Sequence, residues 1–311
     1  MIDKLVISFD KIFNIFLTVI FILIICLGCY TIYDLYKVNN SAQLSDDIIN
    51  LRPKEQTTEY SLEELKKINK DIVAWIRINN TNIDYPIVIG IDNSEYLDKN
   101  YKKEFSTSGS IFLDYRNNRD FKDDYSIIYG HNMELDAMFS DIKKFENPDF
   151  FKGHKTGVLY TADNVYKIKI ITLSKVSAYE NSVFNVMSYS NNKNNLIFDF
   201  FDKHYIFKNK EVLNKNDKLL LLSTCTETGP NEREVLFVKM TKVDKNSNMK
   251  FDSSKLDNSA GDNRNLRKFL PKEMKNIELS ARTIILIILT IIVIIIFLIA
   301  LIQKIHYWKD K

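Results

Sequence analysis

The stretch LLLLSTCTETGPNEREVLFVKM, residues 219–240, joins two apolar runs through a short polar segment. Apolar runs of this length, separated by a loop that contains Gly and Pro, predict two neighbouring antiparallel strands. Cys225 then ends the first strand and Arg233 begins the second, so both face the same rim of the sheet. A guanidinium in that place can favour a thiolate or stabilise a developing oxyanion, and a cysteine nucleophile needs both during acyl transfer.

The residues before this hairpin are rich in β-strand signals. Six more runs of β-branched and aromatic residues lie at 72–78, 83–89, 109–115, 125–130, 157–162 and 165–176. Together with the hairpin they make about eight strands, many joined by Asn, Asp or Gly turns, which is typical of a closed or nearly closed barrel. We expect a helical insertion at 180–205 and a short helical or loop excursion at 145–151. The fold class is therefore mainly β, an eight-stranded barrel with helical insertions.

Two long apolar runs flank this region, at 12–33 and 283–302. Each is long enough to span a hydrocarbon core of about 30 Å. Lysines at both outer ends place both termini in the cytoplasm by the positive-inside rule, although Arg282 weakens the asymmetry. The sequence therefore predicts a two-span cell-membrane protein with a cytoplasmic N-terminus (1–11), a signal anchor (12–33), a second transmembrane helix (283–302) and a cytoplasmic tail (303–311).

Everything between the two spans then lies on the extracellular face. Residues 34–60 are polar and predict a stalk with some helix, a domain follows at 61–243, and residues 244–282 form a polar linker. At the start of the domain, Ser61 and Glu64 form a capping-box pattern before a short helix. The formal net charge of the chain is only +3, and its basic residues are scattered among acidic ones, so nucleic acid is excluded as a partner.

Cys225 is the only thiol of the predicted outer region, because Cys26 and Cys29 fall within the first span. An intramolecular disulfide and a cysteine-based zinc site are therefore excluded there. A lone cysteine is most often a small buried hydrophobe, so a catalytic role needs further support. Of the three histidines in the region only His131 directly follows a strand-like run, and Gly130 before it permits a sharp turn that would project the imidazole over the rim.

These residues carry a family resemblance. YGHNM around His131, LSTCT around Cys225 and the downstream Arg233 resemble the signatures of sortases, the cysteine transpeptidases of Gram-positive cell surfaces. The resemblance extends over residues 60–243 through DIVAWIRINNTNIDYPIV, DNSEYL, GSIFLDYRN and MFSDIKKF, in the order and spacing of the class B branch. It implies an eight-stranded barrel with a helix-bearing insertion before the cysteine strand. The sequence contains no glycine-rich phosphate loop and no metal-binding histidine pair, so we expect no cofactor and no metal.

The resemblance also implies roles and partners. Cys225 would be the nucleophile, His131 the general acid and then the base, and Arg233 the group that orients substrate and stabilises the oxyanion. The substrates would be secreted proteins that bear a C-terminal sorting signal, and the acceptor an amine of a peptidoglycan precursor. A pilin lysine is the alternative acceptor, because a C-terminal span is commoner among pilin-polymerising sortases, although residues 34–60 lack their Asp-Pro-aromatic lid. Two rival functions stay open: a membrane-tethered cysteine protease and a catalytically silent binding module.

Overall fold

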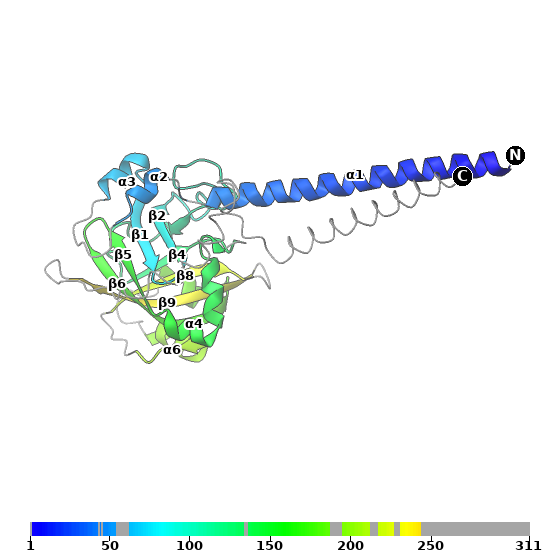
Figure 1. Cartoon of the computed structure of the whole chain (residues 1–311). Coiled ribbons are helices and arrows are strands. Elements are labelled where there is room, and N and C mark those ends of the chain that lie inside the picture. The colour runs from blue at the N-terminus through cyan, green and yellow to red at the C-terminus, as the bar shows by residue number, and fades with distance from the viewer. Residues whose placement is uncertain are drawn as a thin grey trace. The chain divides into compact units, whose positions relative to one another are not determined.

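The computed structural model describes residues 2–42, 44, 46–53, 62–133, 136–186, 195–211, 217–226 and 231–243. The chain divides into two compact units, and the unit that begins at Asn39 contains the β-barrel. The other unit contains most of helix α1 (Ile2–Ala42) (Figure 1). Within α1, Phe13–Asp34 has a mean hydropathy of 2.8 and is long and apolar enough to cross a membrane. The second expected span, residues 283–302, lies outside the described residues.

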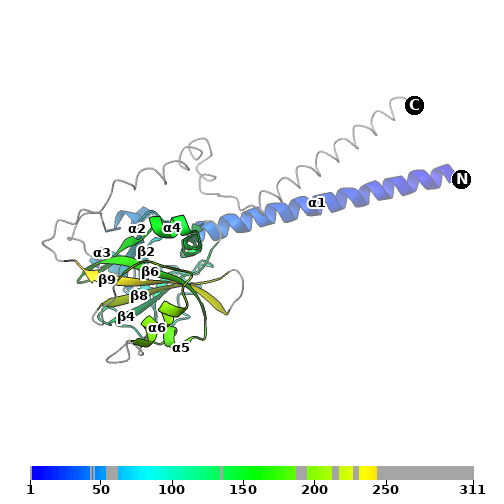
Figure 2. The same ribbon diagram turned by 90° about the horizontal axis from the view of Figure 1, so that it is seen from below.

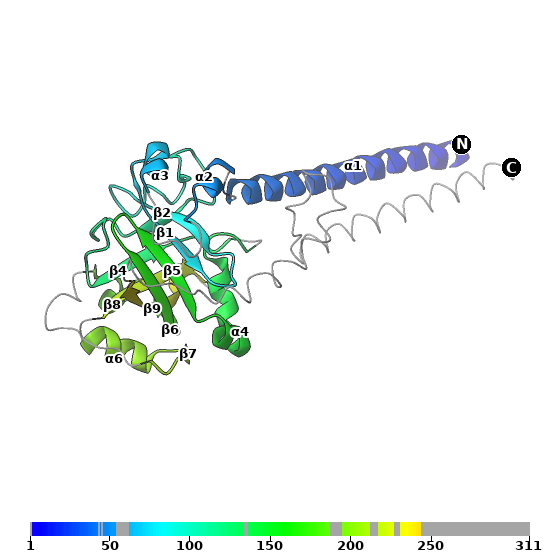
Figure 3. The same cartoon turned by 60° about the vertical axis from the view of Figure 1, so that its left-hand side comes forward.

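The described residues contain nine strands in one sheet (Figures 1 and 3). They are β1 (Ile72–Ile78), β2 (Asp84–Ile89), β3 (Ile111–Leu113), β4 (Tyr125–Tyr129), β5 (Thr156–Thr161), β6 (Val165–Ser177), β7 (Phe207–Lys208), β8 (Lys218–Cys225) and β9 (Glu232–Lys242). The order β5-β1-β2-β3-β4-β8-β9-β6 closes into a barrel because β5 also pairs with β6. The eight predicted strands are confirmed, and the two-residue β7, which pairs with β6, was missed.

The barrel is mixed. The pairs β2–β3 and β4–β8 are parallel, and the remaining pairs are antiparallel. Parallel neighbours cannot be joined by a tight hairpin, so each parallel pair needs a long crossover connection. Both crossovers contribute to the candidate site described below: residues 90–110 join β2 to β3, and the chain from β4 to β8 includes the helical insertion.

Strands β8 and β9 are apolar on both faces, which explains why their sequences lack polar–apolar alternation. Their even-numbered residues join the barrel interior, whereas the odd-numbered ones pack with helices α5 (Asn181–Phe184) and α6 (Asn195–Lys203) on the outside. Figure 2 shows both helices beside β4 and β8. The interior set is Leu220, Leu222, Leu236, Val238 and Met240, and the outer set is Leu219, Leu221, Val235 and Phe237. The expected helical insertion is thus confirmed, as the cover of this outer face.

The helical turns that follow β4 pack against the barrel interior. The 3-10 helix η2 (Ser140–Glu146) and helix α4 (Pro148–Gly153) bury Phe145 and Phe151 in the same cluster as the interior strand residues. Each such ring stabilises the fold by about 1.5–3 kcal/mol through burial alone. Asn147 starts α4, since its side chain accepts hydrogen bonds from two backbone N–H groups of the first turn. The excursion expected at 145–151 is therefore helical.

Residues from the expected stalk pack against the barrel. Ala42, the last residue of α1, is buried in the interior cluster, and Ile48 of helix α2 (Asp46–Asn50) is buried in a third cluster. Arg52 Nη1 lies 2.6 Å from Asp84 Oδ2 on β2. The packed part of this unit therefore includes residues that precede the expected domain start at residue 61.

Helix α3 (Glu63–Ile68) buries Leu65 in the same third cluster as Trp75 of β1. Its N-cap residue is Leu62, which makes no side-chain capping bond. The expected cap, Ser61, lies outside the described residues. Burial of its apolar face stabilises this short helix more than its exposed ion pairs Glu63–Lys66 and Glu64–Lys67 do, as is usual for helices too short to be stable alone.

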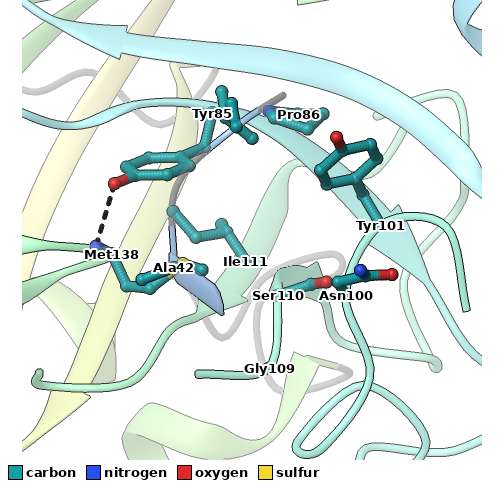
Figure 4. A pocket seen from close by; sticks show the side chains of 10 residues that line it. Ala42, Tyr85, Pro86, Asn100, Tyr101, Gly109, Ser110, Ile111 and Met138 are labelled. Atoms are coloured by element: carbon teal, nitrogen blue, oxygen red, sulfur yellow. Dashed lines mark hydrogen bonds between the residues drawn. The ribbon is translucent and has the colours of Figure 1, made fainter. Parts of the chain in front are cut away.

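A small pocket opens between β2, β3 and the turn after β4 (Figure 4). Ala42, Tyr85 and Met138 line it, and the Met138 backbone N–H donates a hydrogen bond of 3.2 Å to the Tyr85 hydroxyl. Burial raises the pKa of Tyr85 to about 12, so the phenol is neutral at physiological pH. This bond ties the turn that carries His131 to β2.

Candidate active site

The β8–β9 pair brings Cys225 and Arg233 together. The register aligns them directly across the antiparallel ladder, and one step beyond it Thr226 N donates to Glu232 O at 3.3 Å. Side chains at directly opposed positions have Cβ atoms about 4.5–5.5 Å apart. The connecting residues 227–230 lie outside the described residues. The predicted pairing of these two strands is confirmed.

The alternation of side chains along β8 and β9 decides which face of the sheet Cys225 and Arg233 occupy. Cys225 and Arg233 are odd-numbered, like Leu221 and Phe237, so they belong to the outer face that α5 and α6 cover and not to the barrel interior. Cys225 is half-buried. Arg233 Nη1 donates a hydrogen bond of 3.2 Å to the carbonyl of Glu232, which holds its guanidinium near the strand end.

His131 reaches the same rim from β4. The parallel β4–β8 register aligns Tyr129 with Ser223, and Gly130 N donates to Ser223 O at 3.1 Å. Two residues after each aligned position stand His131 and Cys225. Because parallel strands run in the same direction, Cys225 at the end of β8 and His131 two residues after β4 lie at one edge. The register therefore brings together the three residues predicted from the sequence.

The structure gives a packing reason for the glycine at position 130. Among the described glycines the left-handed backbone region is occupied by Gly109, whereas Gly130 does not adopt it. A Cβ on Gly130 would lie 2.7 Å from Cδ2 of the Phe139 ring. The glycine is thus required for close packing of Phe139, whose backbone N–H donates to His131 O at 3.0 Å. This packing constrains the backbone path at His131.

The imidazole of His131 contacts the β2–β3 loop. Its Nε2 lies 2.8 Å from the carbonyl oxygen of Leu97. The other two histidines of the barrel unit interact with helix ends: Nδ1 of His154 lies 2.8 Å from Phe150 O, and Nδ1 of His204 lies 3.0 Å from Phe200 O. Each also stacks on the ring of the same phenylalanine, which is a structural role.

Asp114, which directly follows β3, was missed by sequence reasoning. Its buried carboxylate accepts a bidentate pair from Arg116 (2.8 and 2.7 Å), one bond from Asn93 Nδ2 (2.9 Å) and one from the Tyr129 hydroxyl (3.0 Å). Burial alone would raise the pKa of Asp114, but the bonds from Arg116 and Asn93 outweigh it and hold that pKa below its usual value. Asp114 is therefore an ionised hub.

Arg116 extends the hub to the helical insertion. Its Nη2 donates a hydrogen bond of 2.8 Å to the carbonyl of Phe184, at the end of α5. The Phe184 ring stacks near that of Tyr129, with centroids 6.4 Å apart. The hydrogen bonds of Asp114 and Arg116 thus connect the β2–β3 loop, β4 and α5. A charge pair two residues apart at a strand end is common, so the sequence LDYRN alone does not indicate this role.

A second group of charged residues surrounds Glu234, which follows Arg233 on β9. Glu234 is buried, and Lys175 on β6 bridges it to Glu146 at the end of η2, with Nζ–Oε1 distances of 3.7 and 2.5 Å. Burial and, to a lesser degree, the neighbouring Glu146 raise the pKa of Glu234 to about 7, although the Lys175 ammonium opposes both effects. A hydrogen bond from Lys175 lowers the pKa of Glu146.

The described residues contain no cluster of three or more His, Cys, Asp or Glu side chains that could hold a metal ion. A half-buried thiol, an imidazole and a guanidinium at one rim are the groups that nucleophilic acyl transfer uses. A closed mixed barrel that carries these groups at its strand ends defines a class of protein, the cysteine acyl-transfer enzymes.

Comparison with known proteins identifies the family. Residues 76–241 match the sortase domain, so the chain belongs to the sortase family and is a cysteine transpeptidase. It is 33% identical over 208 residues to sortase B of Listeria monocytogenes, covering 62% of this chain and 80% of that protein, and 29% identical over 189 residues to sortase B of Staphylococcus aureus, covering 58% and 75%.

A solved structure agrees with this placement. The crystal structure of Spy0129, a Streptococcus pyogenes class B sortase involved in pilus biogenesis, shares 31% identity, with a TM-score of 0.54 over 58% of this chain and 97% of that one. The relatives therefore place the chain among class B-like sortases, and the resemblance seen in the sequence is confirmed.

Proposed function

We propose that Cys225 is the nucleophile of this sortase, that His131 is its general acid and base, and that Arg233 orients the substrate and stabilises the oxyanion. The observation that supports this assignment is the strand register. β8 and β9 align Cys225 with Arg233, and β4 ends beside β8 so that His131 follows at the same rim. A thiol, a proton carrier and a fixed cation are the three groups that acyl transfer to an amine requires.

The proposed reaction has two halves. The Cys225 thiolate attacks a backbone carbonyl of the sorting signal, and Arg233 stabilises the oxyanion that forms. As the C–N bond breaks, the leaving amine takes a proton from the His131 imidazolium and a thioester remains. An incoming amine then attacks the thioester and gives its proton to His131, and Cys225 leaves as a thiolate. The second half restores the imidazolium proton and the thiolate that the first half consumed, so no external acid or base is needed.

The proposed substrates are secreted proteins with a C-terminal sorting signal, and the proposed acceptor is an amine of a peptidoglycan precursor. A pilin lysine is the second candidate acceptor, and two observations favour it. One is the 31% identity to a class B sortase involved in pilus biogenesis. The other is the apolar run at 283–302, which with Phe13–Asp34 would give the two-span arrangement.

Mass spectrometry of products tests the reaction class. The full-length protein in detergent is mixed with candidate sorting peptides and with either a short glycine peptide, a cell-wall cross-bridge mimic or a pilin-derived lysine peptide. We expect the amine to divert product from free acid to amide and to raise turnover, because a positioned amine has a large effective-molarity advantage over water. Brisk hydrolysis with every acceptor and no amide would instead make the protein a membrane-tethered cysteine protease. The acceptor that gives most amide decides between wall attachment and polymerisation.

We also propose that both termini are cytoplasmic and that residues 34–282 are extracellular. Cysteine reporters placed before Lys11 and after Lys304 should be shielded from an impermeant thiol reagent in intact cells. A reporter within residues 244–280 should label. Labelling at either terminus would overturn the two-span arrangement without touching the proposed chemistry.

A further inference from the structure

The contact between His131 and Leu97 determines which ring nitrogen carries hydrogen. A carbonyl oxygen can only accept a hydrogen bond, so the Nε2 atom 2.8 Å from Leu97 O must be the donor. In a neutral imidazole one nitrogen is a donor and the other has a lone pair. The lone pair of His131 therefore lies on Nδ1, and Nδ1 is the nitrogen that can take up a proton.

The Leu97 carbonyl is itself held in place by tight packing. Gly109 has φ +57°, and a Cβ built on it would lie 2.5 Å from Leu97 O and 2.7 Å from Tyr96 O. Ser110 N donates to Tyr96 O at 3.0 Å, and Leu97 N donates to Ser94 O at 3.1 Å. The two carbonyls thus occupy the space that a side chain at position 109 would need.

The same peptide segment is anchored on its buried side. Tyr96 is fully buried, and its hydroxyl donates to Asp71 Oδ2 at 2.8 Å and accepts from Asn69 Nδ2 at 2.8 Å. A backbone pinned at Tyr96 and packed against Gly109 has little freedom to move the carbonyl of Leu97. The carbonyl is therefore a preorganised acceptor for His131 and not a chance neighbour.

We propose that Leu97, through its carbonyl, and Gly109, by leaving room for that carbonyl, are positioning residues that fix His131 in the Nε2–H tautomer. Proton exchange with the leaving and incoming amines then runs through Nδ1. In the first half-reaction Nδ1–H protonates the leaving amine, while Nε2–H stays on Leu97 O. In the second half-reaction the Nδ1 lone pair takes the proton of the incoming amine. This inference rests on the proposed role of His131 as acid and base.

Histidine-ring ¹⁵N NMR of the full-length protein in nanodiscs tests the proposal. The chain has four histidines, so the signals are few, and His131→Asn assigns the signal of interest. Ring ¹⁵N shifts at alkaline pH distinguish a protonated from an unprotonated Nε2. We expect the wild type to show the Nε2–H form with an unprotonated Nδ1. An Nδ1–H form for His131 overturns the proposal, whatever the activity of the protein.

Gly109→Ala and Gly157→Ala form a matched pair of variants. At Gly157 a new Cβ would lie 2.3 Å from the carbonyl oxygen of Arg77, an equally severe clash in the barrel wall. We expect Gly109→Ala to displace the Leu97 carbonyl, to give a mixture of His131 tautomers and to lower kcat/KM about 10- to 100-fold. Gly157→Ala should lower the Tm and leave the His131 tautomer unchanged.

The outcomes separate the two proposals. A folded Gly109→Ala variant with an unaltered His131 spectrum, or equal tautomer changes in both glycine variants, overturns the positioning role. If Gly109→Ala does not fold, the wild-type spectrum still decides the tautomer. Full activity of His131→Asn overturns the acid–base role in the proposed function, and it does so independently of which nitrogen carries the hydrogen.

Discussion

The β8–β9 hairpin and the β2–β3 loop hold the rim that carries His131, Cys225 and Arg233 in two different ways. In the hairpin, eight consecutive register pairs from Lys218–Met240 to Cys225–Arg233 determine where the thiol and the guanidinium lie. In the loop, one carbonyl contacts His131, and Gly109 and the Asp114 hub support the segments around it. Many ladder bonds fix the positions of Cys225 and Arg233, whereas one hydrogen bond holds the His131 imidazole on the loop. Substitutions in the two regions should therefore affect activity and stability differently.

Cys225→Ala should have the largest effect. No other thiol lies in the barrel unit, so we expect loss of both peptide cleavage and thioester capture, by at least about 10⁴-fold in kcat/KM. The hairpin should remain folded, because the change removes one sulfur atom at a half-buried position. Cys26→Ala with Cys29→Ala is the control and should keep full activity. Wild-type activity of Cys225→Ala would show that Cys225 is not the nucleophile.

Arg233→Lys should have the next largest effect. Lysine keeps the charge but lacks the planar fork, so we expect kcat/KM to fall about 10²- to 10³-fold while the Tm stays within error. Arg119→Lys is the matched control, since Arg119 is exposed and donates to the Lys70 carbonyl away from the rim. Near-normal rates for Arg233→Lys would assign that arginine a structural role in the hairpin.

Asp114→Ala should destabilise the β2–β3 loop. The change leaves Arg116, Asn93 and Tyr129 without their shared acceptor, and we expect a loss of about 2–4 kcal/mol in the free energy of unfolding. Asp120→Ala, which removes an exposed ion pair with Lys122, should cost at most about 1 kcal/mol.

Hydrogen exchange sharpens this test. In Asp114→Ala, amides of the β2–β3 loop should exchange faster, while those of β8 and β9 should keep their protection. Equal loss of protection in both regions would mean that the hub supports the whole barrel and that the two regions are not independent.

Glu234→Gln should have the smallest effect, and it depends on pH. The pKa of Glu234 is raised from 4.5 to about 7, so its stabilising contribution is full below about pH 4.5 and is lost as pH rises to about 7, because the unfolded chain ionises first. With allowance for screening by Lys175 we expect a difference of about 1 kcal/mol across this window, which Glu234→Gln removes. Glu146, with a lowered pKa, contributes in the opposite direction at more acidic pH. Urea titrations at several pH values measure the difference, and parallel pH curves for both proteins would contradict it.

Strand prediction from the sequence worked because the signal is local. Leu219–Leu222 and Val235–Val238 are continuous apolar runs of strand length, and the pairing follows from the short loop between them. The contribution of Leu97 could not be predicted, since the interacting group is a backbone carbonyl that every residue carries. Asp114 was missed because its partners, Asn93 and Tyr129, are distant in sequence and come together through the fold. For Gly130 the residue was noticed, but its constraint comes from Phe139 across the turn.

The parallel pairing of β4 with β8 has a consequence for biosynthesis. Lys218 at the start of β8 donates a hydrogen bond of 2.7 Å to the carbonyl of Asp123, 95 residues earlier in the chain. Closing so long a segment is entropically costly and slow compared with forming hairpins, so this pairing should come late in folding. His131 and Cys225 cannot meet until it has formed. A chain still emerging from the ribosome, with β1 to β6 complete, would therefore carry His131 but not the strand that bears Cys225, so the proposed active site could form only after β8 has been synthesised.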